Sequence, residues 1–125
     1  MSDLPTLEAF DVPDAVARML DQPAIWRQAL VLFVRHFADW EAAWTNCVGR
    51  DAEEVQRVHA LRSGAANVGA KDLAVVAGQL EDVLRHGGGQ AASVDALRRQ
   101  LREEYGRAWR AAAAFCRHAS PEAMP

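Results

Sequence analysis

The sequence predicts an all-α protein: an antiparallel four-helix bundle in up-down-up-down order, with an additional short N-terminal helix. Three observations lead to this prediction. About one residue in five is alanine, which favours helix. β-Branched residues are too few and too scattered for a sheet, and there is a single isoleucine. Apolar residues recur every three or four positions in stretches joined by short turns, which is typical of antiparallel helical neighbours.

The first part of the chain predicts a lead-in followed by a short helix. Residues 1–12 are the lead-in. Pro13 opens a helix that runs to about Leu20, because the missing N–H of proline costs nothing in a first turn. Pro23 separates this helix from the next element.

A single long helix is expected from Ala24 to about Val48. Its apolar residues alternate steps of four and three along one stripe, which we interpret as core packing. The stripe consists of Trp26, Leu30, Phe33, Phe37, Trp40, Trp44 and Cys47.

The next two helices are expected over 52–66 and 71–86, joined by a tight break. Gly49 marks a turn before the first, where Asp51 with Glu54 resembles a capping box. Gly69 lies in the break and can take the left-handed conformation of a helix end. The expected inward residues are Val55, Val58, Leu61 and Ala65 on the first helix and Leu73, Val76, Ala77, Leu80 and Leu84 on the second.

The last part of the chain predicts a linker at Gly87-Gly88-Gly89, a long helix over 92–117 and a tail over 119–125. We therefore expect one domain over residues 1–125, with a core of about 13–118. The inward residues of the last helix are expected to be Leu97, Leu101, Tyr105, Ala108, Ala112 and Phe115.

Composition excludes several classes of function. The net charge is −3 and the sequence pI about 5.8, which argues against a nucleic-acid binder. No apolar stretch approaches the ~20 residues of a membrane span, so we expect a cytoplasmic protein that does not bind membranes. Cys47 and Cys116 are expected to be buried core residues. Arginines interleaved with glutamates are expected to form a solvated helix face: Arg98, Arg99, Arg102, Arg107 and Arg110.

Motifs for intrinsic chemistry are missing. No histidine has a glutamate three positions before it, as a di-iron bundle needs, and neither a phosphate-binding loop nor a nucleophile motif is present. We therefore expect no metal site, and no ATP chemistry or hydrolysis by the domain itself.

One histidine has a distinctive setting. His59 lies on the flank of its helix, with Gln56, Arg62 and Ser63 at spacings of three and four. An imidazole is substantially neutral near pH 7 and can carry a phosphoryl group, whose charge an arginine can offset. Spacing alone favours the simpler interpretation of an ordinary surface histidine. The other three are expected to be structural or solvated, with His118 in the tail: His36, His86 and His118.

The segment from His59 to Ala70, followed by Leu73 and the pair Leu80-Glu81, resembles the histidine-containing phosphotransfer (HPt) domain family. The signature of that family is His-x-Leu-Lys-Gly, then small residues, Gly-Ala, a leucine, and a Leu-Glu pair one helix later. About 25 residues match with their spacings kept, and the helix layout agrees.

The resemblance implies that His59 accepts a phosphoryl group from the aspartyl-phosphate of a receiver domain and returns it to another. The protein is then a phosphorelay intermediate of a two-component system, a phosphocarrier rather than a turnover enzyme. Its expected partners are receiver domains of a hybrid sensor kinase or a response regulator, which supply the aspartate and Mg²⁺. The absence of a cofactor of its own is likewise what the family resemblance implies. Such domains are usually monomers.

Two positions depart from the signature. Arg62 replaces its lysine and keeps the charge, whereas Ser63 replaces its glycine, with Gly64 directly after. Ser63 can hydrogen-bond the imidazole or the phosphoryl group, slow transfer or narrow partner choice. A small-residue neighbourhood is expected to keep the histidine accessible: Ala65, Ala66, Ala70 and Ala74.

Glu81 and Arg85 match positions that line the flank of the histidine in this family. On the helical wheel they form one row with Ala74 and Gly78, and we expect that row to face His59.

Two alternatives stay open. Ser63 motivates an HPt-like binding module that docks to a receiver or a kinase without accepting phosphate. A weaker alternative is a purely structural bundle. Either a stand-alone protein or a domain of a hybrid kinase is compatible with the sequence.

Overall fold

The computed structural model describes residues 4–87 and 91–119, which contain six α-helices and no strand. This confirms the predicted all-α class. The last residues of the expected linker, Gly88 and Gly89, and the tail residues 120–125 lie outside the described part. The helices are α1 (Val12–Arg18), α2 (Pro23–His36), α3 (Trp40–Cys47), α4 (Asp51–Val68), α5 (Lys71–His86) and α6 (Ala91–Ala119).

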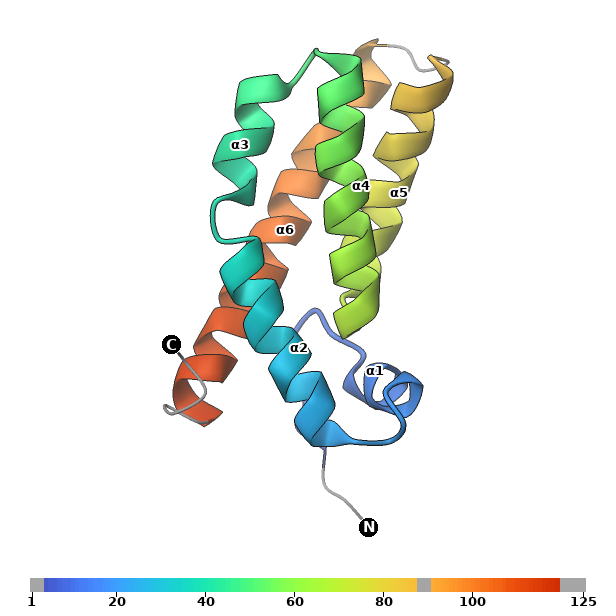
Figure 1. Ribbon diagram of the computed structural model, residues 1–125. Coiled ribbons are helices and arrows are strands. Elements are labelled where there is room, and N and C mark those ends of the chain that lie inside the picture. Colours follow the sequence, from blue (N-terminus) through green and yellow to red (C-terminus); the bar gives the residue numbers. More distant parts are fainter. Residues whose placement is uncertain (1–3, 88–90, 120–125) are drawn as a thin grey trace.

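The helices form an up-down-up-down bundle of four members, of which α2 and α3 together make the first (Figure 1). This first member lies between α4 on one side and α6 on the other, with α5 completing the ring. The short α1 packs against α2 and α4 near the α4–α5 connection. Ahead of it, the ring of Phe10 meets the ring of Phe33 edge to face at 6.2 Å.

The prediction of one helix from Ala24 to Val48 is wrong, because the chain leaves the helix between His36 and Trp40. The break frees backbone carbonyls, and α6 supplies donors for them. The Tyr105 hydroxyl donates to the carbonyl of Phe37, and the Trp109 indole donates to that of Val34 at 2.9 Å. A buried phenol or indole needs such a partner, so tertiary hydrogen bonds offset the cost of the break.

The predicted apolar stripe is confirmed as core despite the break. All seven of its residues are buried, from Trp26 at the start of α2 to Cys47 at the end of α3. Cys47 and Cys116 are both free and buried, as the sequence predicts.

The expected capping box at the start of α4 is also wrong. Arg50 is the N-cap and makes no side-chain capping bond. Glu54 is instead completely buried and accepts hydrogen bonds from the backbone N–H of Gly49 and the indole of Trp44, at 3.1 and 3.0 Å. Arg98 completes the set with two bonds of 2.9 and 2.7 Å. The carboxylate therefore ties α3, the turn and α6 together.

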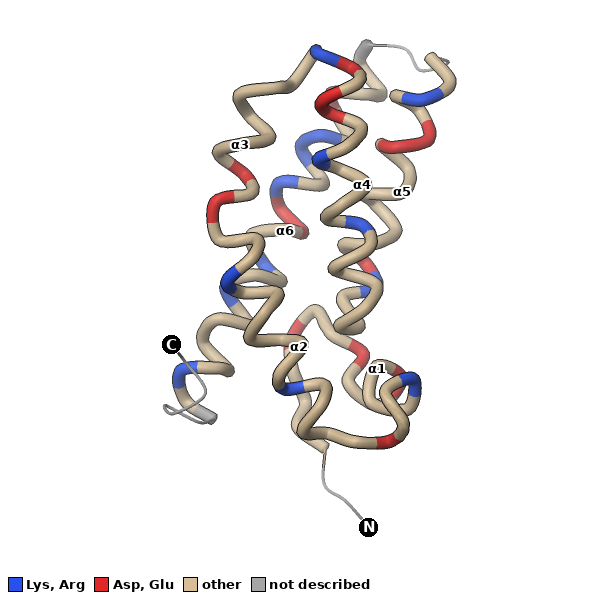
Figure 2. The backbone as a smooth tube through the Cα atoms, viewed as in Figure 1, with Lys and Arg blue, Asp and Glu red and all other residues tan. Residues whose placement is uncertain are grey.

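Arg98 consequently does not belong to a solvated face, because only 18% of its side chain is exposed. Arg102 and Arg107 form ion pairs with Glu41 and Glu104 at 3.3 and 3.0 Å. Figure 2 shows basic and acidic positions mixed along the helices rather than gathered by sign. None of the described helices is long and apolar enough to cross a membrane.

The turn between α4 and α5 sets which residues of the two helices face each other. Gly69 has φ +91°, and a Cβ there would lie 2.8 Å from the carbonyl oxygen of Asp11, so glycine is required on both counts. Ala70 follows as the cap of α5. Because both helices rise about 1.5 Å per residue, residues equally far from Ala70 in sequence lie at the same level.

Candidate functional site

The α4–α5 hairpin brings His59 beside Glu81. The two residues stand equally far from Ala70, one on each helix, and His59 Nδ1 lies 2.9 Å from Glu81 Oε2. The histidine side chain is 55% exposed, whereas that of the glutamate is 4% exposed. The α5 row that we expect to face His59 does so at Glu81.

Two arginines complete the polar cluster. Arg62 Nη1 donates to Glu81 Oε1 at 3.1 Å, and Arg85 Nε donates to Glu81 Oε2 at 2.8 Å. Both side chains are nearly half exposed, at 46% and 49%. The cluster thus consists of one buried carboxylate with three exposed partners, His59, Arg62 and Arg85, and we call it the Glu81 cluster.

The electrostatics of the cluster keep Glu81 ionised. Burial raises the pKa of this carboxyl, but hydrogen bonds from Arg85, Arg62 and His59 outweigh burial and lower it below its usual value. An ionised carboxylate only accepts hydrogen bonds, so the neutral His59 ring carries its proton on Nδ1. Nε2 is then left with a free lone pair, and this is the nitrogen able to act as a nucleophile.

The remaining predicted site residues lie on different sides of α4. Ser63 and Gln56 are exposed, one turn after and one turn before His59. Gly64 instead faces α2, since a Cβ there would lie 2.5 Å from a ring carbon of Phe37. Its role is close helix packing, and Ala65 and Ala70 are likewise fully buried in the core rather than placed around His59.

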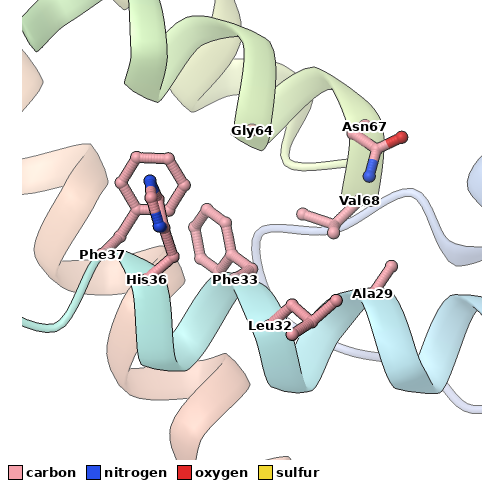
Figure 3. Close-up of a pocket in the computed structure, with 8 residues that line it drawn as sticks. All are labelled: Ala29, Leu32, Phe33, His36, Phe37, Gly64, Asn67 and Val68. Carbon is pink, nitrogen blue, oxygen red and sulfur yellow. The ribbon is translucent and has the colours of Figure 1, made fainter.

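An open apolar cleft of about 200 Å³ lies between α2 and the C-terminal half of α4 (Figure 3). Gly64, Asn67 and Val68 form its α4 wall, roughly 8 to 14 Å beyond His59 along the helix axis. Leu32, on the α2 side, is 60% exposed. Sequence analysis missed this residue, although an apolar residue off the buried stripe of its helix was the signal available.

The other histidines have no comparable setting. His36 is exposed and contacts the edge of the Phe37 ring at 4.7 Å between centroids. His86 Nδ1 lies 2.8 Å from the backbone carbonyl oxygen of Asp82. His118 is not in a tail but within α6, where it is exposed.

Within residues 4–87 and 91–119, no group of three or more His, Cys, Asp or Glu side chains is placed to hold a metal ion. The chemistry available in the cluster is that of a solvent-facing imidazole nitrogen, oriented by a carboxylate and flanked by two cations.

The structure is thus a four-helix bundle that presents a histidine, held by a buried carboxylate, on its surface. A family model, the Hpt domain, matches residues 27–111 of this chain. The chain therefore belongs to the Hpt domain family. Comparisons with curated proteins and with solved structures give no significant match.

Proposed function

We propose that this protein is a phosphorelay intermediate of a two-component system, with His59 as its phospho-acceptor. Membership of the Hpt family implies phosphotransfer in such systems. The observation that carries the assignment to His59 is its hydrogen bond to Glu81, which in the neutral ring places the proton on Nδ1 and the lone pair on Nε2 of a side chain that is 55% exposed.

The transfer step needs no proton to leave the histidine. The lone pair of Nε2 attacks the phosphorus of a receiver aspartyl-phosphate, the P–N bond forms, and the P–O bond breaks to release the aspartate carboxylate. The phosphorylated ring keeps its proton on Nδ1, where Glu81 offsets the positive charge that develops on the ring. In the reverse direction a receiver aspartate attacks phosphorus, and the P–N electrons return to Nε2.

The flanking charges and the partner supply the rest. Arg62 and Arg85 offset the negative charge of the phosphoryl group, which is most of what phosphoryl transfer requires beyond positioning. The receiver brings the aspartate and Mg²⁺, so this domain needs no cofactor of its own. It acts in the cytoplasm as a monomeric carrier and does not turn over a substrate by itself.

The cleft beside Gly64 supports docking of a receiver against α2 and α4. It is apolar, its α4 wall lies more than one helical turn beyond His59 on the side that faces α2, and the exposed Leu32 adds to it.

The test is transfer of radioactive phosphate from phosphorylated receiver domains of the same genome to the purified protein. We expect labelling of the wild type, its loss in His59→Gln, and no loss in His86→Gln, which alters another exposed histidine. Labelling that survives His59→Gln would refute the site. Tight binding of a phosphorylated receiver without any transfer would favour the alternative of a binding module. Ser63, in place of the glycine of the signature, is the reason to consider that alternative.

A further inference from the structure

Gly78 is a buried glycine in the interior of α5, three residues before Glu81. Glycine in a helix interior is less stable than alanine, so a position that keeps it needs a local reason. Its φ is not positive, unlike those of Gly69 and Gly87, and the reason is therefore not the backbone conformation. A close approach by another group remains.

That group is the guanidinium of Arg62. A Cβ on Gly78 would lie 3.2 Å from Arg62 Nε, 3.3 Å from its Cζ and 3.6 Å from its Nη2. Arg62 and Gly78 stand equally far from Ala70, so the turn brings them to the same level. The guanidinium lies so close to Gly78 that a Cβ there would require it to shift by a few tenths of an ångström.

This contact fixes a flexible cation from two directions. The Nε, Cζ and Nη2 atoms of Arg62 lie over Gly78, while Nη1 donates to Glu81 Oε1 at 3.1 Å. A long, half-exposed side chain loses rotamer entropy when it is held in one place, and contacts on two sides offset part of that cost. A guanidinium has five N–H donors and Glu81 uses one, which leaves others for a phosphoryl group.

We propose that Gly78 is a positioning residue for phosphoryl transfer, because it seats the Arg62 guanidinium beside His59. The inference rests on the proposed function. It also accounts for the departure at position 62, where this chain has arginine and the signature has lysine. A guanidinium is planar and can lie flat against the backbone at Gly78, whereas an ammonium group has no planar face. Gly78 and Arg62 are thus a matched pair, because a lysine at position 62 would not need the space that the glycine leaves.

The experiment is a double-mutant cycle with Gly78→Ala, Arg62→Lys and the double variant. The isolated protein is phosphorylated with phosphoramidate, a small-molecule donor, and both the rate of acceptance and the lifetime of phosphohistidine are measured. We expect Gly78→Ala to slow acceptance about threefold, the effect of weakening one partly exposed charged contact. In the Arg62→Lys background the same change should have no effect, because nothing is seated there.

Three further measurements separate positioning from a structural role. Gly78→Ala should raise the thermal midpoint while lowering the rate, and it should shift the NMR signal of the Arg62 Nε–H. Gly78→Met, which fills the seat, should slow acceptance more than alanine does. Gly106→Ala is the matched control: it is also a buried helical glycine beneath a guanidinium, with a Cβ 2.8 Å from Arg110 Nη1, but on α6 away from the Glu81 cluster.

Two results overturn the proposal: equal rates for wild type and Gly78→Ala, or an equal loss with arginine and with lysine at position 62. Failure of the proposed function is a different result. In that case no phosphorylated receiver labels the wild type, whatever residue stands at position 78.

Discussion

Two glutamates, Glu54 and Glu81, are the buried acidic side chains of the described residues, and they carry out opposite tasks. Each lies in a helix of the bundle and binds arginine. Around Glu54 the partners are enclosed: Trp44 is fully buried, and Arg98 is only 18% exposed. Around Glu81 all three partners are about half exposed. The same ionic chemistry holds helices together in one place and presents groups to solvent in the other.

Exposure of the partners, rather than burial of the carboxylate, is what separates the two sets of contacts. In both cases burial raises the pKa of the carboxyl, and hydrogen bonds outweigh burial and lower it. A survey of perturbed carboxylates would therefore select both residues alike. Of the two, only the Glu81 cluster includes a histidine, and the side chain of that histidine is 55% exposed.

The largest effect is expected from removing each carboxylate in turn. Glu54→Ala leaves the largely buried Arg98 with only its 3.5 Å contact to the exposed Asp95 and should lower the free energy of unfolding by about 3 kcal/mol. In Glu81→Ala the half-exposed partners can be hydrated instead, so the free energy of unfolding should fall by only about 1 kcal/mol. Urea unfolding followed by tryptophan fluorescence measures both.

Function should respond in the opposite order. Under conditions where both variants are folded, Glu54→Ala should accept phosphate from phosphoramidate as the wild type does, whereas Glu81→Ala should be slower. Equal losses of stability in the two variants would contradict the distinction between an enclosed and an open carboxylate.

The sequence predicted the Glu81 cluster better than the Glu54 contacts. The resemblance to the HPt signature pointed to Glu81 and Arg85 as neighbours of His59, and the helical wheel put both on one row. The short turn at Gly69 keeps these residues on one hairpin. Glu54 meets Arg98 across 44 residues, and its short-range pattern with Asp51 pointed to a capping box. Local spacing carries no information about a partner on a distant helix.

The break between α2 and α3 could not be predicted from local spacing either, because the groups that favour it lie on a distant helix. The apolar stripe continues through Phe37 to Trp40, and no proline or glycine interrupts it. The groups that favour the break, Tyr105 and Trp109, lie on α6 and became visible only when the helices were packed.

A smaller effect is expected from acid. Both glutamates have a folded pKa below the ordinary value of 4.5, so their contribution to stability is present above that value and is lost as pH falls through the folded pKa. The free energy of unfolding of the wild type should therefore decline below about pH 4.5. Glu54→Gln and Glu81→Gln should each flatten this decline.

Salt distinguishes the two contributions. At about 1 M salt, where the Debye length is about 3 Å, the part due to Glu81 should shrink because its partners are in water. The part due to Glu54 should persist. Measuring unfolding against pH at low and high salt checks both, and a salt effect confined to the Glu54 contribution would reverse our interpretation of the two environments.

The smallest effect, and the sharpest comparison, comes from replacing arginine with lysine on each carboxylate. Arg98 binds Glu54 with two bonds of 2.9 and 2.7 Å, a geometry that one ammonium cannot reproduce. Arg98→Lys should therefore cost about 1–2 kcal/mol of stability. Arg85 gives Glu81 a single bond from a half-exposed side chain, and Arg85→Lys should cost less than about 0.5 kcal/mol.

Urea unfolding of the two lysine variants checks this comparison. Similar costs would mean that neither bonding geometry nor solvent exposure separates the two carboxylates. A tolerant Arg85 beside an intolerant Arg98 is the outcome expected when one carboxylate is open to water and the other is enclosed.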